Sequence, residues 1–476
     1  MTEFASKQKK REVTDERGNA YLLKGKVGEG GQGMVCLTNH ENTLVKICKR
    51  PKAGREQWME HIRWLMRQDL DSLNIARPVA RIVKPQPGYV MELMDGLIPL
   101  QSLVEETEVA LQEQNTQAYL DQGGIRRRLQ LLAKLARILA NLHGRGMAFG
   151  DLSPSNIYVS EDPQYSEVWL IDCDNISVNQ RNSYDSAEEF IGKPGGLYTP
   201  FYGAPEVIRG EAMISSQTDS WSFSVIAFRL LTALHPLVGD MVSDGEPSLE
   251  DDALSGKLPW VDHPDDRSNE ASSGLPRDLV LLKQLKVLFE KSFNAGKDEP
   301  GQRPSLSEWA EKLEHACQWL VNCDSCGSSY FYKPVKRKLS CGFCDSPAKL
   351  RSLLFLRHYL YDQSILEVEG AKQTDCFVDT GFRQVLRNAT SVDVKTSPPG
   401  SSFYENARPL YQITLSDDGV NITPSGSTTI KLQIGHSKPQ MFNKPFKLAN
   451  SERSGKHISV MVGEGSQLHD VCIFKW

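Results

Sequence analysis

A glycine-rich segment near the N-terminus has the composition of a phosphate-binding loop. Residues 28–35 read GEGGQGMV and fit G-x-G-x-x-G-x-V, with Gly28, Gly30, Gly33 and Val35 at the fixed positions. Glycine has no Cβ, so backbone N–H groups can approach phosphate oxygens closely. The segment lies between strand-like runs and not before a helix, which disfavours a dinucleotide-binding fold. By itself, the pattern also fits an ordinary glycine-rich hairpin turn.

A lysine follows on the next expected strand. Lys46 lies in the run LVKI at 44–47, where its ammonium could hold the α- and β-phosphates of a nucleotide if a carboxylate fixes it. We expect Glu60 to supply that carboxylate, with Glu56 as the second candidate, because both lie on a helix expected at 56–66. A lone strand lysine is more often solvated, but the neighbouring signals favour phosphate binding.

Two acidic residues and an amide form a second group. Asp151 and Asn156 lie in FGDLSPSNI at 149–157, and Asp172 ends the apolar run VWLID at 168–172. Amide and carboxylate oxygens are hard ligands that Mg²⁺ prefers, so Asn156 and Asp172 are candidate ligands for Mg²⁺ or Mn²⁺. Each residue could instead be a turn, cap or strand-end residue. Their joint occurrence favours one site.

These motifs, in their order, resemble the eukaryotic-like (Hanks-type) Ser/Thr protein kinase family, in the form found in its divergent bacterial branch. Residues 142–157 resemble the catalytic loop H-R-D-L-K-P-x-N, and 168–174 resemble the strand that leads into D-F-G. YTPFYGAPE at 198–206 is similar to the end of an activation segment, and DSWSF at 219–223 to the start of a central helix. Arg303 is then expected to pair with Glu206. The resemblance covers residues 20 to 320.

The resemblance implies an α+β bilobal fold that binds ATP between its lobes and transfers the γ-phosphoryl group to Ser or Thr of protein substrates, itself included. Asp151 would accept the hydroxyl proton, and Thr199 would support it, as in Ser/Thr enzymes of the family. The nucleotide would contact Met91, the hinge from Glu92 to Met94, and Lys46.

Several positions depart from the family pattern. Gly150 replaces the arginine that receives a phosphate on the activation loop, which predicts an enzyme that does not need such phosphorylation. Ser153 replaces a lysine near the transferring phosphate, Asp174 replaces the glycine of D-F-G, and Leu44 replaces an alanine above adenine. These changes make a catalytically inactive nucleotide-binding scaffold, acting through its C-terminal modules, the alternative.

The elements expected around these motifs change along the chain. Short strands dominate from 20 to 100, and an amphipathic helix is indicated by leucines at three- and four-residue spacing between 125 and 142. The polar stretches 105–122 and 243–274 indicate loops. After 350, apolar residues alternate with polar ones between turns, which indicates antiparallel β structure.

Four of the ten cysteines form C-x₂-C-x₁₄-C-x₂-C: Cys323, Cys326, Cys341 and Cys344. This spacing predicts a closed, structural Zn²⁺ site. The other six are scattered, which favours a reducing compartment and a cytoplasmic protein. Basic residues crowd the cluster at Lys333, Lys336, Arg337, Lys338, Lys349 and Arg351. They fit a nucleic-acid contact or a solvated hairpin, and the lack of a stacking pattern favours the hairpin.

The bulk composition limits the function classes. With 476 residues and 39% hydrophobic residues, the chain predicts two to four globular domains. The net charge of −5 gives no overall attraction to nucleic acid or membrane. The most apolar stretch, 221–234, contains Arg229 and indicates a buried helix, not a membrane span. We therefore expect a disordered basic tail (1–14), kinase lobes (15–95 and 96–318), a zinc ribbon (319–350) and a β-rich domain for partner or substrate recognition (351–476).

Overall fold

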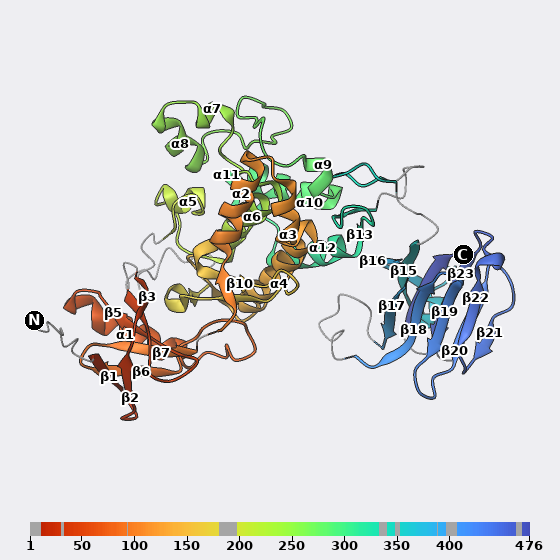
Figure 1. The fold of residues 1–476 in the computed structure, drawn as a ribbon, viewed down its shortest axis with the longest axis horizontal. Coiled ribbons are helices and arrows are strands. Elements are labelled where there is room, and N and C mark those ends of the chain that lie inside the picture. Colours follow the sequence, from red (N-terminus) through yellow and green to blue (C-terminus); the bar gives the residue numbers. More distant parts are fainter. Residues whose placement is uncertain are drawn as a thin grey trace, which may run out of the picture. The chain divides into compact units, whose positions relative to one another are not determined.

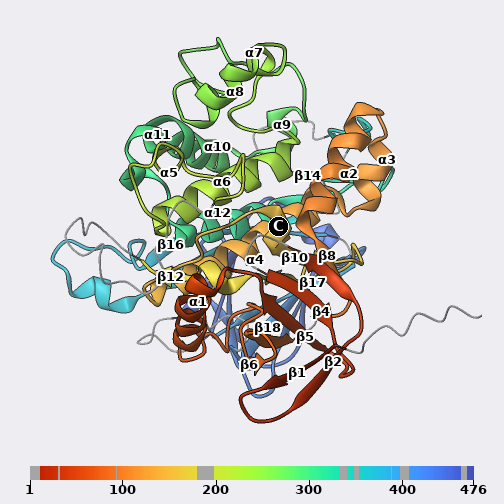
Figure 2. The same cartoon turned by 90° about the vertical axis from the view of Figure 1, so that its left-hand side faces the viewer.

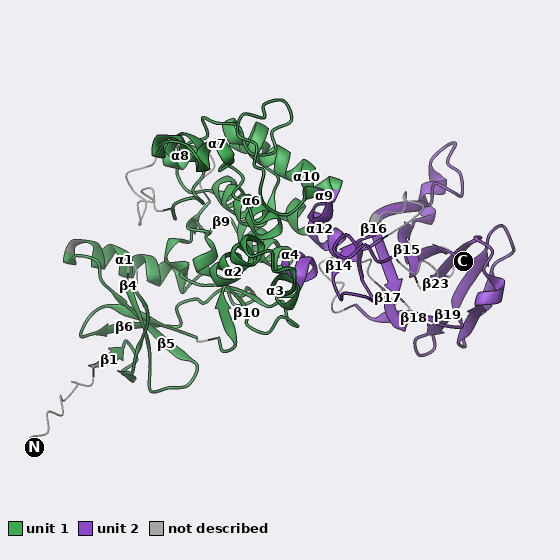
Figure 3. Ribbon diagram, turned by 45° about the horizontal axis from the view of Figure 1, so that its top comes forward, with its two compact units in different colours: residues 1–123, 130–277, 283–310 green, residues 124–129, 278–282, 311–476 purple. Residues whose placement is uncertain are grey.

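The computed structural model describes residues 11–29, 33–92, 94–179, 198–332, 340–347, 353–387, 389–396, 407–462 and 469–476. The chain divides into two compact units (Figure 3). Unit 1 comprises residues 1–123, 130–277 and 283–310, and unit 2 comprises 124–129, 278–282 and 311–476. None of the described helices is long and apolar enough to cross a membrane.

The first part of unit 1 is an antiparallel sheet with one helix. The strand order is β2-β1-β6-β7-β5-β4-β3, and the helix α1 (Lys52–Leu65) lies beside the sheet (Figure 2). Its core is formed by Val13, Val45, Ile47, Ala80, Ile82 and Val90. The strands are β1 (Arg11–Asp15), β2 (Ala20–Leu23), β3 (Lys26–Glu29), β4 (Gly33–Leu37), β5 (Thr43–Cys48), β6 (Ala80–Lys84) and β7 (Gly88–Glu92).

The expected tail at 1–14 is wrong for residues 11–14, which belong to β1. Val13 is buried and pairs with Tyr21 across the hairpin, while Thr14 pairs with Ala20. The buried carboxylate of Asp15 fixes the turn, because it accepts hydrogen bonds from the backbone N–H groups of Arg17 and Asn19. Residues 1–10 lie outside the described residues.

The rest of unit 1 is mainly helical. Its longer helices are α2 (Leu100–Gln112), α4 (Gly124–Gly144, whose first turns belong to unit 2), α6 (Ser216–Thr232), α10 (Lys283–Glu290) and α12 (Leu306–Gln318, which continues into unit 2). The shorter ones are α3 (Thr116–Asp121), α5 (Pro205–Ile208), α7 (Asp240–Ser243), α8 (Pro247–Leu254) and α11 (Gly296–Asp298), while α9 (Arg277–Val280) belongs to unit 2 from Asp278 on. Short strands complete it: β8 (Leu97–Pro99), β9 (Met147–Ala148), β10 (Ile157–Ser160), β11 (Val168–Leu170) and β12 (Ser177–Val178).

The first stretch expected as a loop is helical, and the second is so only in part. Residues 105–122 hold most of α2 and all of α3, whereas residues 243–274 hold α8 and form a loop from 255 to 274. In α2, Leu103, Val104, Thr107 and Ala110 are buried on one face. Four such residues at helical spacing anchor the helix although most of its sequence is polar.

The apolar stretch at 221–234 forms most of α6, a buried core helix as expected. Ser215 and Thr218 form a capping box at its N-terminus. Trp221, Phe223 and Phe228 are fully buried. Arg229 is compensated within the protein, because its guanidinium forms two hydrogen bonds with the carboxylate of Glu108.

Unit 2 combines a small hairpin with a two-sheet β structure (Figure 1). The hairpin is β13 (Leu320–Asn322) and β14 (Ser329–Phe331). The six-stranded sheet has the order β16-β15-β24-β23-β20-β21, and the four-stranded sheet has the order β17-β18-β19-β22. The bounds are β15 (Leu353–Tyr361), β16 (Phe377–Arg387), β17 (Thr390–Lys395), β18 (Pro409–Ser416), β19 (Gly419–Pro424), β20 (Ile430–Ile434), β21 (Gln440–Phe442), β22 (Phe446–Ala449), β23 (His457–Val462) and β24 (His469–Lys475).

Both sheets contribute to one apolar core, which explains the period-two sequence pattern. Ile413 and Ile422 come from the four-stranded sheet and Leu432 and Val460 from the six-stranded sheet, and all four are buried in the same cluster. Alternate residues point to opposite faces of a strand, so this pattern buries one face of each sheet. The predicted β-rich C-terminal region is confirmed.

A buried ion pair joins α5 to the segment before α12 in the helical part of unit 1. Arg303 and Glu206 pair as expected, with Nη1–Oε1 and Nη2–Oε2 distances of 2.7 and 2.8 Å. The Arg303 guanidinium also lies 4.9 Å from the ring centroid of Trp221, and its Nε donates to the carbonyl of Gly296 at 2.7 Å.

We predict that Arg303→Met lowers the free energy of unfolding by about 3–5 kcal/mol, because it leaves the Glu206 carboxylate buried without its partner. Urea titration followed by tryptophan fluorescence measures this. Lys257→Met is the control, because the Lys257–Asp252 pair is exposed and its loss should cost below about 1 kcal/mol. Equal losses in the two variants would contradict the prediction.

Candidate active site

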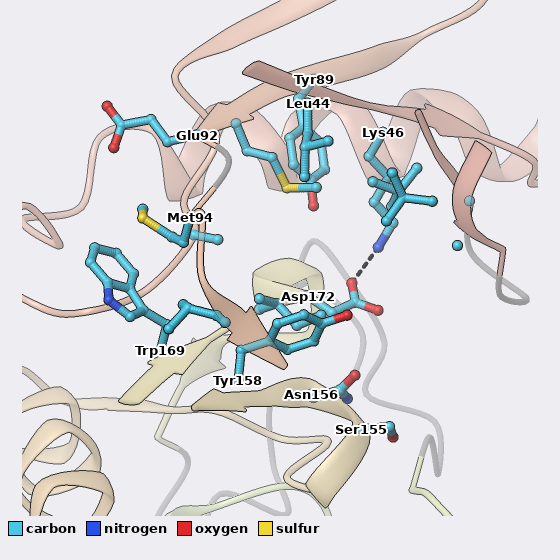
Figure 4. A pocket seen from close by; sticks show the side chains of 18 of the residues that line it. Leu44, Lys46, Tyr89, Glu92, Met94, Ser155, Asn156, Tyr158, Trp169 and Asp172 are labelled. Carbon is cyan, nitrogen blue, oxygen red and sulfur yellow. Dashed lines mark hydrogen bonds and ion pairs between the residues drawn. The ribbon is translucent and has the colours of Figure 1, made fainter. Parts of the chain in front are cut away.

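A cavity of about 590 Å³ in unit 1 brings the predicted nucleotide-binding residues together (Figure 4). Its lining includes Gly28, Gly33, Val35, Lys46, Met91, Glu92, Met94, Asp151, Asn156 and Asp172. Gly30 lies outside the described residues. The volume lies within the range of small-molecule sites. Residues separated by more than 120 positions in the sequence therefore face one space.

Gly33 is required by the close approach of two strands. Val35 on β4 pairs with Lys46 on β5, and Gly33 pairs with Cys48. A Cβ added at Gly33 would lie 2.8 Å from the carbonyl oxygen of Ile47 and 3.0 Å from Cε of Lys46. A larger residue here would displace the strand that carries Lys46.

Lys46 is nearly excluded from water and lies between two carboxylates. Its side chain is 5% exposed; Nζ contacts a carboxylate oxygen of Asp172 and lies 2.9 Å from Oδ2 of Asp174. Burial disfavours the charged ammonium, but Asp174 and Asp172 outweigh this effect and raise the pKa of Lys46 above its ordinary value. Lys46 is therefore held as a cation at the cavity wall.

The carboxylate partner predicted for Lys46 is wrong. Glu60 pairs with Arg63 on the outer side of α1, where its side chain is 43% exposed, and Glu56 is also exposed. The inner side of α1 is occupied by Trp58, which is buried. Positions two residues apart on a helix are about 200° apart, so Glu60 cannot share the direction of Trp58.

The space next to Lys46 is filled by Asp174, which follows Asp172 in the short helix η2 (Cys173–Asn175). The Asp174 carboxylate is fully buried. It accepts hydrogen bonds from Tyr89 Oη at 2.6 Å and Trp58 Nε1 at 3.1 Å. Burial and the neighbouring Asp174 raise the pKa of Tyr89 well above its ordinary value, so Tyr89 stays a donor.

Asp151 is oriented by its neighbours. Thr199 donates two hydrogen bonds to Oδ1 of Asp151, from its backbone N–H at 3.0 Å and from Oγ1 at 2.8 Å. Asn156 Nδ2 donates to the Asp151 carbonyl at 2.9 Å. The expected contact between Thr199 and Asp151 is thus present.

The donor set of Asn156 and Asp172 fits a magnesium ion. Because Asn156 uses its amide nitrogen on Asp151, its oxygen is left to face the cavity, as Figure 4 shows. Asp172 lines the same cavity with its side chain 32% exposed. Its backbone is left-handed, with φ of 59°, which is uncommon for a residue other than glycine. Burial raises the pKa of the Asp172 carboxyl, and Lys46 opposes that effect.

Asp219 holds the loop that carries Asp151, a role that the sequence reasoning missed. Its carboxylate accepts the backbone N–H groups of Phe149 at 2.6 Å and Gly150 at 2.9 Å, and it contacts Nε2 of His143 at 2.9 Å. Asp219 is 1% exposed. The signal was an aspartate in the first turn of an otherwise apolar helix, where a charge needs buried donors.

The departures at Gly150 and Ser153 have structural reasons. Gly150 has φ of 95°, and a Cβ there would lie 2.9 Å from the carbonyl oxygen of Asn175. An arginine cannot take that position without moving the loop. Ser153 is fully buried and its hydroxyl lies 2.9 Å from that of Ser155, so it does not line the cavity.

Aromatic residues at the far end of the cavity were also missed. Tyr158 on β10 and Trp169 on β11 pair across the strands and line the cavity together with Met94 (Figure 4). Leu44 lines it from above and pairs with Met91. Apart from Glu92, the side chains named at this end are apolar or aromatic, which suits a flat base, whereas the Lys46 end is charged.

The four cysteines of the C-x₂-C pairs converge in unit 2. Their sulfur atoms all lie within 4.8 Å of one another, with Sγ–Sγ distances of 3.6 Å for Cys323–Cys344 and 3.7 Å for Cys326–Cys341. The backbone N–H of Ser325 donates to the Cys323 sulfur. This arrangement is compatible with one tetrahedral Zn²⁺. The basic residues noted around the cluster lie outside the described residues.

The fold and this cavity define a bilobal nucleotide-binding protein of the kinase type. The sequence model of the protein kinase domain matches residues 21–308, which is more than half of the chain. The chain therefore belongs to the protein kinase domain family.

Among its relatives is the serine/threonine-protein kinase pkn2 of Myxococcus xanthus, 31% identical over 191 residues, which are 40% of this chain and 20% of that protein. The maternal embryonic leucine zipper kinase of Danio rerio is 26% identical over 48% of this chain and 31% of that protein. The chain thus spans a third or less of these relatives. A rhoptry antigen kinase domain from Toxoplasma gondii overlays with a TM-score of 0.42 at 13% identity, over 64% of this chain and 85% of that one.

A neutral histidine supports the segment that carries Thr199. His235 Nε2 donates to the carbonyl of Phe201 at 2.9 Å, and its Nδ1 accepts the N–H of Leu237 at 3.2 Å. Phe201 has φ of 73°. Burial lowers the pKa of His235 from 6.5 to about 4.

We predict that this histidine makes the protein acid-sensitive. Between pH 6.5 and 4 the unfolded chain binds a proton at His235 that the folded protein does not, so stability falls as pH falls through this window, by up to about 3 kcal/mol. Urea unfolding at several pH values measures it. His235→Gln should flatten that part of the curve, while an unchanged slope would contradict the assignment to His235.

Proposed function

We propose that this protein is an ATP-dependent protein kinase that transfers the γ-phosphoryl group of ATP to Ser or Thr of protein substrates. The observation that carries the proposal is the convergence of Lys46, Asp151, Asn156 and Asp172 on one cavity. Phosphoryl transfer has a loose transition state, so positioned charges supply most of the catalysis. The cavity offers one cation, one base and two oxygen ligands.

The arrangement assigns a role to each residue. The adenine would lie at the apolar end, next to Met91 and the hinge from Glu92 to Met94, and the triphosphate would reach Lys46 under the glycine-rich segment. Asn156 and Asp172 would hold Mg²⁺ or Mn²⁺, which when bound neutralises phosphate charge. Asp151, oriented by Thr199, would take the proton of the attacking hydroxyl.

Two observations support Ser and Thr as acceptors. Thr199 contacts Asp151 as in Ser/Thr enzymes of the family, and the named relatives include a serine/threonine-protein kinase. Protein substrates follow from family membership, and autophosphorylation is one case. The β domain of unit 2 is proposed to recognise substrates or partners. Nucleic acid and membrane are not among the proposed partners. The six cysteines outside the metal cluster form no disulfide, which supports a cytoplasmic setting.

A nucleotide-binding scaffold is the second candidate, favoured by one observation. Ser153 is buried away from the cavity, so the loop supplies no cation to the transferring phosphate. This loss should slow the chemical step. The four remaining charged and amide groups favour an active enzyme.

Regulation should differ from that of relatives with an arginine before the catalytic aspartate. Since position 150 holds a glycine, a phosphate on the activation loop lacks its usual receiver. We therefore propose that the enzyme is active without phosphorylation of that loop.

We predict that the full chain incorporates label from γ-labelled ATP with Mg²⁺, and that Asp151→Asn reduces the rate by about 100-fold or more, because it removes the proton acceptor. Label on the chain itself and on a basic protein substrate, identified by phosphoamino-acid analysis, is the measurement. The control is Asp162→Asn on an exposed loop.

The outcomes separate the two candidates. Label lost only in Asp151→Asn, on phosphoserine or phosphothreonine, supports the kinase. Binding of ATP with no transfer in the unaltered chain supports the scaffold. Equal label in Asp151→Asn and the unaltered chain overturns the role of Asp151.

We also propose structural Zn²⁺ at the cysteine cluster and predict one zinc ion per chain by elemental analysis. Cys341→Ser or a strong chelator should remove the metal and expose residues 319–350 to proteolysis, because metal binding stabilises such a small module. Cys317→Ser, outside the cluster, should keep it. A metal-free chain with the same proteolysis pattern would contradict the zinc site.

A further inference from the structure

A buried carboxylate outside the family's usual set lies beside the predicted catalytic lysine. Asp174 receives hydrogen bonds or an ion pair from three different elements: Trp58 on α1, Tyr89 on β7 and Lys46 on β5. Its side chain is fully buried, and its two oxygens are both engaged. Asp174 therefore connects the helix, the sheet and η2 at one point.

Asp172 by itself cannot hold Lys46 during the proposed reaction. Asp172 is partly exposed and faces the cavity, where its oxygens are needed for the metal. Lys46 is almost fully buried, and a buried ammonium without an anion is strongly disfavoured. Of the acidic side chains that the structure describes, those of Asp172 and Asp174 lie within 4.0 Å of the Lys46 ammonium. Asp174 remains available when Asp172 binds metal.

The helix α1 contributes no carboxylate to Lys46; instead, it contributes a hydrogen-bond donor, Trp58, to Asp174. Trp58 is 2% exposed, and its ring centroid lies 5.8 Å from that of Tyr89, so the indole is fixed against the sheet. Its N–H is aimed at Asp174. A shift of α1 would remove a donor from Asp174, and the contact between Asp174 and Lys46 would change with it.

We infer that Asp174 is the positioning residue for Lys46, and that Trp58 and Tyr89 position Asp174. This inference rests on the proposed kinase function. Asp174 fixes the ammonium for the phosphates without touching the nucleotide, and α1 acts on the site through the Trp58 indole. The departure from glycine at position 174 thereby supplies the anion that α1 lacks.

A double-mutant cycle with Lys46 tests the inference. Asp174→Asn keeps the shape of the side chain and removes its charge, and we expect kcat/KM for ATP to fall by about 100-fold, as for a misplaced catalytic group. In a Lys46→Met background the same change should lower residual activity by less than about twofold, because a residue that acts through Lys46 loses its effect without it. If the fold losses of the two single variants multiply in the double variant, Asp174 has a merely structural role and the inference is overturned.

Two further variants test the carboxylate first predicted as the partner of Lys46 and an exposed carboxylate as a control. Glu60→Gln tests the assignment that the structure replaces; a loss with Glu60→Gln and none with Asp174→Asn overturns the inference. Asp71→Asn removes an exposed carboxylate paired with Arg77 and should leave the activity unchanged.

If Asp174→Asn does not fold, as judged by circular dichroism, Trp58→Phe and Tyr89→Phe take its place. Tyr89→Phe removes one donor and keeps the ring, and Trp58→Phe removes one donor and keeps a smaller aromatic ring. Each should lower kcat/KM by about tenfold, an effect again absent in the Lys46→Met background.

Failure of the inference can be told from failure of the proposed function. If the unaltered chain transfers no phosphate, the kinase proposal fails, and the same cycle is measured on the dissociation constant of ATP with Mg²⁺. A crystal structure of the full chain with ATP and Mg²⁺ then decides. Lys46 Nζ within 3.5 Å of Asp174 supports the inference, and Lys46 turned to another carboxylate overturns it.

Discussion

A positive charge that is nearly excluded from water must be matched by a negative one, and the ammonium of Lys46 is such a charge. The structure around the cavity follows from this constraint. Strand β5 carries the lysine, η2 and the residue before it bring two carboxylates to it, and β7 and α1 supply the donors that satisfy Asp174. The glycine at position 33 lets the glycine-rich strand approach β5 closely. The positions of β4, β5 and α1 around the cavity thus depend on the charge of Lys46 and its partners.

In the helical part of unit 1, too, buried charges are matched by buried partners. Asp219 at the start of α6 collects the backbone N–H groups of Phe149 and Gly150, and so sets the position of Asp151 from beneath. Glu206 and Arg303 fix the end of the segment that carries Thr199. Buried polar groups that are fully satisfied are rigid, and the proposed transfer reaction, which relies on positioning, would need such rigidity.

Unit 2 has a separate physical basis. Its two sheets share an apolar core, and the β13–β14 turn and the segment 341–344 each bring two cysteine sulfurs within reach of one metal ion. Neither feature needs the nucleotide cavity. Family membership therefore describes residues 21–308.

The sequence by itself determined those features whose geometry is set by residues close together in the chain. A turn such as that of Asp151 and Asn156 brings its own residues together, two C-x₂-C pairs can each wrap one metal, and alternating residues such as Ile430 and Leu432 must face one side of a strand. Only the tertiary structure decided which carboxylate meets Lys46. That choice depends on the rotation of α1, which presents Trp58 inward and Glu60 outward, and on packing between segments more than 100 residues apart. Local spacing carries no information about such contacts, because they are set by how separate elements bury their surfaces against one another.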